Sequence, residues 1–180
     1  MSQTLEKLAQ SKLELMSLLN CDNVHKLPKL TKVVLSCGLN ATRVDSATAK
    51  LVQTDVGLIA GLRPVRIFAK KSVAGFKVRE GQLIALKTTL RSVRMFEFLD
   101  RLIHIALPKL REFRGLNVGA FDKHNNISFG IKEYSIFPEV KYNKSTRLLG
   151  INITLCVRAD NKLNAIRLLT FLGIPFRTVV

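Results

Sequence analysis

Apolar and polar residues alternate along several short segments of the chain, and a period of two is typical of β-strands with one buried face. The clearest segment covers residues 83–91. Its apolar side holds Ile84, Leu86, Thr88 and Leu90, and its polar side holds Lys87, Thr89 and Arg91. The same alternation occurs at residues 30–37, 126–132 and 151–158, and residues 65–68 form a shorter run. The pattern therefore predicts five strands.

Four other segments repeat apolar residues at intervals of three and four, which indicates amphipathic helices. They are residues 3–19, a helix from Asp45 or Ser46 to Gly61, residues 93–107 capped by Ser92, and a last helix capped by Asp160 or Asn161. We expect the second helix to bury Ala47, Leu51, Thr54, Leu58 and Leu62. The third should bury Met95, Phe96, Leu99, Ile103, Ala106 and Leu107, and the last Leu163, Ile166 and Leu169.

These elements predict an α+β fold with a mostly antiparallel sheet, because strands with one apolar face need cover on that face alone. The helices should lie on one side and leave the other open. The expected open side carries Lys32, Ser36, Lys87, Thr89, Asn152, Thr154 and Arg158, with no acidic residue. No linker or repeat divides the chain, so we expect one domain over residues 1–180.

The charge of the chain narrows the choice of partner. Lysine and arginine number 29 against 13 acidic residues, a net charge of +16. Such an excess is best explained by binding to a polyanion, first RNA or DNA and second an anionic membrane surface. No apolar run is long enough for a spanning helix, and the first residues lack signal-peptide features, so we expect a soluble intracellular protein without a membrane partner.

Catalytic signatures are lacking in the sequence. No phosphate-binding loop, dinucleotide fingerprint, nucleophile elbow or zinc-protease motif occurs, and Cys21, Cys37 and Cys156 are too widely spaced for a metal or redox pair. The histidines have no partner at ligand spacing, and Asp45 and Asp55 are best explained as a helix cap and a solvated position. We expect no enzyme, no cofactor and no metal.

Residues 69–81 form a basic loop without a clear period. The loop contains one acidic residue, Glu80, and four basic residues, Lys70, Lys71, Lys77 and Arg79. Basic loops on a rigid sheet suit a folded RNA, whose phosphates follow an irregular shape. We expect this loop to be flexible, with Phe76 either stacking on a base or packing down as an anchor.

Several motifs carry a resemblance to a known family. They are KKSVAGFKVREG at residues 70–81, KTTLR at 87–91, MFEFLDRL at 95–102, REFRGL at 111–116, FPE at 137–139, GINIT at 150–154 and PFR at 175–177. In this order they resemble bacterial-type large-subunit ribosomal protein five, across nearly the whole chain. The resemblance is to the bacterial and organellar branch.

The resemblance implies a structural role in the central protuberance of the large ribosomal subunit. There the open sheet face would hold 5S rRNA against the large rRNA, and the basic loop would reach the tRNA in the peptidyl site. Neighbouring ribosomal proteins, including one of the small-subunit head, would be further partners. The expected rRNA-binding residues are Lys32, Ser36, Arg63, Phe76, Lys87, Thr89 and Arg91. The expected tRNA-contacting residues are Lys70, Lys71, Ser72, Gly75, Phe76, Lys77 and Arg79.

Two positions depart from the family pattern. Ser36 stands where the family has asparagine, and Leu62 stands where it has glutamine. Together with the high charge, these departures favour an organellar ribosome, with the mitochondrial matrix preferred and the bacterial cytoplasm as the alternative; the 5S rRNA itself could be replaced there. The other functional hypotheses are a non-ribosomal module that binds structured RNA and a small enzyme acting on nucleic acid.

Overall fold

The computed structural model describes residues 16, 19, 23–39, 46–110, 113–140 and 149–177. Its strands form one open antiparallel sheet in the order β2-β3-β1-β5-β4, and with the helices this confirms the α+β class. The strands are β1 (Lys29–Gly38), β2 (Val65–Phe68), β3 (Leu83–Leu90), β4 (Ile127–Ile131) and β5 (Ile151–Arg158). All five lie where the alternation predicts them. The predicted helix at residues 3–19 lies almost wholly outside the described residues.

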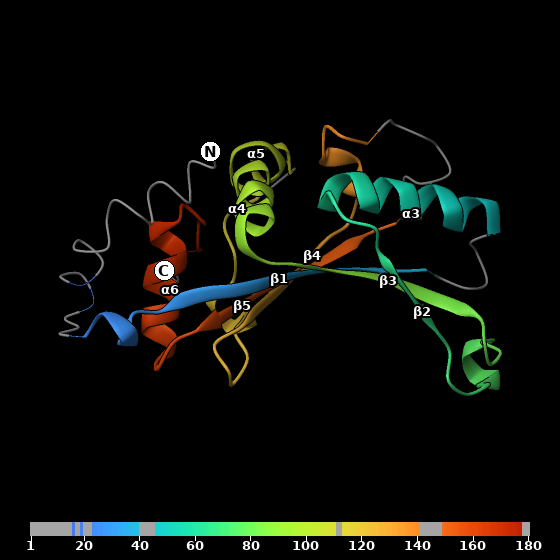
Figure 1. Cartoon of the computed structure of the whole chain (residues 1–180), viewed down its shortest axis with the longest axis horizontal. Helices are drawn as coiled ribbons and strands as arrows, with labels where there is room; N and C mark the ends of the chain where they lie inside the picture. Colours follow the sequence, from blue (N-terminus) through green and yellow to red (C-terminus); the bar gives the residue numbers. More distant parts are fainter. Residues whose placement is uncertain are drawn as a thin grey trace. The chain divides into compact units, whose positions relative to one another are not determined.

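The helices of the described ranges are α3 (Ser46–Ala60), α4 (Ser92–Arg101), α5 (Leu107–Lys109) and α6 (Lys162–Phe171) (Figure 1). A π-helical segment, Leu102–Ala106, joins α4 to α5. Short 3-10 turns cover Val24–Lys26, Ala74–Phe76, Val118–Ala120 and Tyr134–Ile136. None of these helices is long and apolar enough to cross a membrane.

The chain divides into two compact units. Unit 1 comprises residues 1–33, 91–129 and 154–180, and unit 2 comprises residues 34–90 and 130–153. Strands β1, β4 and β5 each contribute residues to both units. That the whole chain behaves as one folding domain stays a prediction.

The core of unit 2 joins its sheet to α3. Val52 and Val56 of α3 pack with Cys37, Leu39 and Leu86 in one buried cluster. Since Cys37 and Leu86 face the helix, the alternate positions on β1 and β3 face away from it. Burial of Cys37 raises the pKa of its thiol to about 11, so the thiol stays protonated and unreactive at neutral pH.

The buried face of α3 differs from the predicted one. Val52, Val56 and Ile59 are fully buried, whereas Leu51 and Leu58 are 48% and 54% exposed. The helix carries apolar side chains on two adjacent faces, so periodicity alone cannot tell which one meets the sheet. The observed face is turned by about one residue, roughly 100°.

Two other helices also depart from prediction. In α6, Ala165, Leu168 and Leu169 are buried, but the expected Leu163 is 67% exposed. In the third predicted helix, Phe98 of α4 and Leu102 of the π-helical segment are buried, whereas the expected Phe96 and Ile103 are half-buried.

Of the predicted helix caps, Ser92 is wrong, whereas Asn161 occupies the N-cap position predicted for the last helix. Ser92 does not cap α4, because Arg91 is the N-cap residue and makes no side-chain cap hydrogen bond. Ser92 instead adopts a left-handed backbone, with φ of 51°. Asn161 is the N-cap residue of α6 but also makes no side-chain cap hydrogen bond. Asp45 lies outside the described residues, as does the side chain of Ser46.

Thr88 is an exception in the core of unit 2. It is 4% exposed, and its hydroxyl has no hydrogen-bond partner within the described part of the chain. A buried hydroxyl without a partner costs desolvation energy that a methyl group does not. We expect Thr88→Val, which keeps the side-chain shape, to raise the free energy of unfolding by about 1 kcal/mol. Urea denaturation measures this, with exposed Thr89→Val as control, and a loss of stability would show that the hydroxyl is satisfied.

Candidate RNA-binding surface

On the side of the sheet in unit 2 that faces away from α3, polar residues lie next to the exposed Val65 of β2. Lys87 and Thr89 are exposed on β3, between the buried residues Leu86, Thr88 and Leu90. Ser36 on β1 is half-buried and points to the same side, because its neighbour Cys37 belongs to the core cluster. We call the surface formed by Ser36, Lys87 and Thr89 the open face.

The strands contribute no negative charge to the open face. None of the five strands contains aspartate or glutamate. The polar groups therefore present a lysine ammonium and hydroxyls that can donate hydrogen bonds without acidic competition. Such a surface suits phosphates, ribose hydroxyls and base edges of a structured RNA.

Two of the predicted rRNA-binding residues, Lys32 and Arg91, belong to unit 1 and not to the open face of unit 2. Lys32 is half-buried on β1, and Arg91 is exposed at the N-terminus of α4. Arg91 follows the end of β3, so the predicted alternation continues one residue past the strand. Their role in RNA binding stays a prediction.

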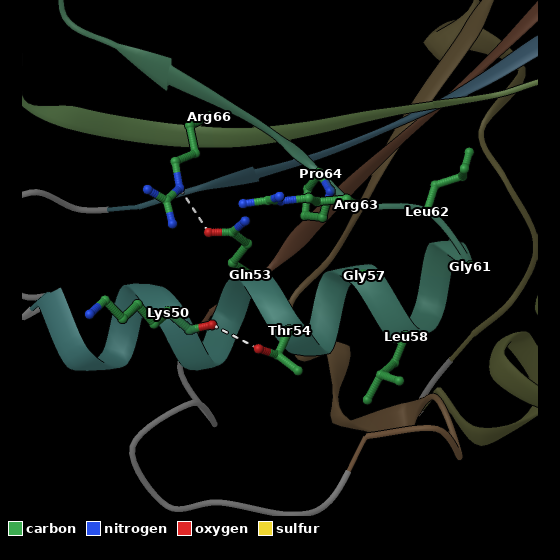
Figure 2. Close-up of a pocket in the computed structure, with 10 residues that line it drawn as sticks. All are labelled: Lys50, Gln53, Thr54, Gly57, Leu58, Gly61, Leu62, Arg63, Pro64 and Arg66. Atoms are coloured by element: carbon green, nitrogen blue, oxygen red, sulfur yellow. Dashed lines mark hydrogen bonds between the residues drawn. The ribbon is translucent and has the colours of Figure 1, made fainter.

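Arg63 lies in the turn between α3 and β2, where it lines a hollow of about 520 Å³ (Figure 2). We call this hollow the α3–β2 groove. Its lining includes Lys50, Gln53, Leu58 and Arg66, and the Nε of Arg66 donates a hydrogen bond of 2.8 Å to Oε1 of Gln53. The groove was not predicted from the sequence, although Arg63 and Arg66 lie on either side of Pro64 in the chain.

The basic loop is a short hairpin that extends from the ends of β2 and β3 (Figure 1). Val73 and Val78 exchange backbone hydrogen bonds of 2.9 and 3.3 Å. The Ser72 hydroxyl accepts from the Glu80 amide at 2.9 Å, and the Ala69 amide donates to the Gln82 carbonyl at 2.8 Å. The segment thus has a defined backbone where an irregular loop was expected, and its mobility stays a prediction.

The side chains of this hairpin point into solvent. Lys70, Lys71, Ser72, Gly75, Lys77 and Arg79 are all exposed. Lys77 holds a left-handed backbone with φ of 52°, which closes the turn after the Ala74–Phe76 segment. The hairpin therefore groups the predicted tRNA-contacting residues on one projection.

Phe76 is 77% exposed, so its interpretation as a packed anchor is wrong. The ring lines the edge of an apolar hollow that also includes Leu39, Val73 and Ile84. Exposing a phenyl ring costs hydrophobic free energy that a stacking partner would recover. Stacking of Phe76 on a base stays a prediction.

Asp55 is not the solvated residue that the sequence suggested. Its Oδ2 accepts a hydrogen bond of 3.1 Å from the hydroxyl of Tyr134, which is 1% exposed. Partial burial raises the pKa of Asp55, and the hydrogen bond from Tyr134 lowers it by less. The pair ties the Tyr134–Ile136 turn to α3. Within the described ranges, no three histidine, cysteine or acidic side chains gather as a metal site would need.

Comparison with known proteins links these features to one family. The model described as "Ribosomal protein L5" matches residues 23–79, and the one described as "ribosomal L5P family C-terminus" matches residues 83–176. The two matches meet in the basic hairpin, just before β3.

Individual relatives cover most of the chain. Large ribosomal subunit protein uL5 of Anaplasma marginale (strain Florida) is 44% identical over 171 residues, 95% of this chain and 94% of the relative. The uL5 protein of Alkaliphilus metalliredigens is 43% identical over 154 residues, 86% of each chain. Large ribosomal subunit protein uL5c of Zygnema circumcarinatum is 40% identical over 162 residues, 90% of this chain and 88% of the relative. With both family models and these relatives spanning its strands and its basic hairpin, the chain belongs to the ribosomal protein L5 family.

Proposed function

We propose that this ribosomal protein is a structural component of the large subunit that binds 5S rRNA and the large rRNA in the central protuberance. The observation that carries the proposal is the open face, where Lys87 and Thr89 are exposed above a fully buried row of β3 residues. A rigid strand fixes the backbone spacing of both residues, so no backbone has to be ordered when they bind RNA.

We further propose that the basic hairpin contacts tRNA in the peptidyl site and that neighbouring proteins include one of the small-subunit head. Support comes from the exposed cations of the hairpin and from its projection beyond β2 and β3. Phosphates are the natural partners of such cations, and Phe76 supplies an exposed ring for a base.

The compartment is also a proposal. We favour a mitochondrial ribosome over a bacterial one because Ser36 and Leu62 replace polar amides of the family pattern. Organelle fractionation of the source cells, followed by sedimentation, measures this directly. Co-migration with a bacterial-type cytoplasmic subunit in a cell without organelles would reject the mitochondrial assignment.

The test of the rRNA proposal is a double variant of the open face, Lys87→Ala with Thr89→Ala. We expect its affinity for 5S rRNA to fall by on the order of 1–3 kcal/mol, with a shallower dependence on salt because one phosphate contact is lost. Lys123→Ala, an exposed cation in a turn of unit 1, is the matched control. Equal affinities of the double variant and the control would reject the open face as the rRNA surface.

A further inference from the structure

The α3–β2 groove lies on the opposite side of the sheet from the open face. Arg66 of β2 pairs with Leu86, whose side chain is buried toward α3. Paired residues of neighbouring strands point to the same side, so Arg66 faces α3. The preceding pair, Val65 with Lys87, points to the open face. An RNA strand that lies on the open face therefore leaves Arg66 uncovered, because the sheet separates the two surfaces.

The groove concentrates positive charge. Lys50, Arg63 and Arg66 line it, all three are exposed, and no acidic residue belongs to the lining. In the described part of the chain, no carboxylate pairs with any of these three cations. Figure 2 shows the guanidinium groups of Arg63 and Arg66 both extending toward Gln53. Cations held together in this way repel one another, and an anion bound between them removes that repulsion.

A hydrogen bond from α3 holds one of these guanidinium groups in place. Gln53 is half-buried, and its Oε1 accepts from the Nε of Arg66 at 2.8 Å. The bond uses the Nε donor alone, so both terminal nitrogens of Arg66 stay available to a ligand. A guanidinium held in one orientation loses less side-chain entropy on binding, and its planar fork matches the oxygens of a phosphate. Gln53 is therefore a positioning residue for Arg66.

The lining of the groove favours a phosphate over a segment of protein. Apart from its lysine, α3 contributes Gln53, Thr54, Gly57 and Leu58. Leu58 is the apolar residue among them, and Figure 2 shows its side chain pointing to the side of α3 away from Arg63 and Arg66. Tight protein interfaces depend on buried apolar or aromatic anchors, whereas a contact with a nucleic-acid backbone needs cations and hydrogen-bond donors. The groove supplies the second kind of contact.

We propose that the α3–β2 groove binds backbone phosphates of the large rRNA, while the open face holds 5S rRNA on the other side of the sheet. The inference rests on the proposed function, which places 5S rRNA on the open face, and it assigns the second RNA to a different surface. Arg63 and Arg66 bind phosphate oxygens through their terminal nitrogens, and Lys50 adds a further charge. Lys50, Gln53 and Arg66 are not among the rRNA-binding residues expected from the sequence. The sheet of unit 2 then lies between two RNAs.

The experiment measures binding of isolated large rRNA to the full chain already bound to 5S rRNA, by filter binding over a range of salt concentrations. The groove variant is Lys50→Gln with Arg66→Gln, which changes no residue of the open face. We expect it to weaken binding of the large rRNA by about tenfold and to make the salt dependence shallower, because two phosphate contacts are lost. Its affinity for 5S rRNA should stay within about twofold of the parent, because the two surfaces are separate.

Two further variants make the result specific. Lys109→Gln with Lys123→Gln is the matched control, because it removes the same charge from two exposed positions of unit 1. Gln53→Met removes the hydrogen bond to Arg66 without changing the charge. We expect it to weaken binding of the large rRNA about threefold with an unchanged salt dependence, and an unchanged affinity would overturn the positioning role of Gln53. Equal melting temperatures of the variants establish that the fold is kept.

Three outcomes bear on the proposal itself. Equal binding of the large rRNA by the groove variant and the matched control overturns it. An equal loss of affinity for 5S rRNA and for the large rRNA also overturns it, because the groove would then belong to the 5S rRNA surface. A third arm measures poly-glutamate on the same variants. If the groove variant loses poly-glutamate binding and keeps that of the large rRNA, the groove is a site for an acidic protein segment and the proposal is wrong.

Failure of the proposed function is seen separately. In that case the affinity for 5S rRNA does not respond to Lys87→Ala with Thr89→Ala, whatever the groove variant does to binding of the large rRNA.

Discussion

Replacing Gly115 with alanine is expected to lower the free energy of unfolding by about 3 kcal/mol. Gly115 has φ of 103°, a backbone conformation that side chains with a Cβ avoid. A Cβ placed there would lie 2.7 Å from both the Arg177 nitrogen and the Phe176 carbonyl carbon. Those atoms belong to the backbone, so they cannot turn aside as a flexible side chain can.

The contact at Gly115 holds a short parallel bridge between Leu116 and Phe176. The Leu116 amide donates to the Pro175 carbonyl, and the Arg177 amide donates to the Leu116 carbonyl, each at 2.9 Å. Phe176 also stacks on Phe121, with ring centroids 5.9 Å apart. Pushing the two segments apart would loosen the bridge and the stack together, which is why one methyl group should have a large effect.

Urea denaturation of the full chain measures this effect. Gly38→Ala is the matched control, since a Cβ at Gly38 meets nothing within 4 Å and its φ is not positive. We expect the control to change stability by less than about 0.5 kcal/mol. If Gly115→Ala behaves like Gly38→Ala, the pairing of Leu116 with Phe176 does not form in solution.

Removing residues 73–78 is expected to leave the fold and subunit assembly intact while weakening retention of tRNA in the peptidyl site. The deletion removes both partners of the Val73–Val78 bridge together, so it leaves no unpaired strand behind. The base of the hairpin keeps the hydrogen bonds of Ala69 with Gln82 and of Gly81 with Ala69. What is lost is the exposed ring of Phe76 and the charge of Lys77.

The expected size of the effect on tRNA retention follows from the loss of Phe76 and Lys77. A stacked aromatic contributes on the order of 1–3 kcal/mol per base, so we expect the dissociation rate of tRNA to rise by about tenfold or more. The increase in the dissociation rate should be greatest at low salt, where the contact of Lys77 with phosphate is strongest. Phe76→Ala separates the ring from the charge, because it should raise the rate without changing the salt dependence.

The measurements are the melting temperature of the free protein and the dissociation rate of tRNA from ribosomes that carry the variant. We expect the melting temperature to stay within about 2 °C of the parent, which corresponds to about 0.5–1 kcal/mol for a chain of 180 residues. A large fall in melting temperature together with an unchanged dissociation rate would mean that the hairpin supports the fold and does not contact tRNA.

Alternation made four strands predictable from the sequence, because β1, β3, β4 and β5 each have one buried face and one open face, whereas β2 has no buried residue. β3 illustrates this: Leu86, Thr88 and Leu90 are buried, and Lys87 and Thr89 are exposed, as the alternation indicates. A shift by one residue would bury a lysine, so the pattern permits only one orientation. For the same reason, the candidate residues on the open face could be named in advance.

The orientation of the helices was not predictable in this way. On α3, both the row of Leu51 and Leu58 and the row of Val52 and Val56 are apolar, and either could cover the sheet. Tertiary packing selected the valines, which fit with Leu86 in the core cluster. Leu51 and Leu58 were left exposed. The α3–β2 groove also depends on a contact between elements, because Arg66 of β2 binds Gln53 of α3.

The sequence by itself therefore determined the strands, their open face, the excess of positive charge and the motifs of the family. Each of these depends on residues that are near one another in the chain or on composition, so no distant contact is needed to recognise it. Only the tertiary structure decided which face of α3 is buried, that Phe76 is exposed, and that Tyr134 binds Asp55 across 79 positions of the chain. Those outcomes depend on which distant side chains fit together, and packing energies of that kind are set by three-dimensional complementarity that a periodic pattern does not contain.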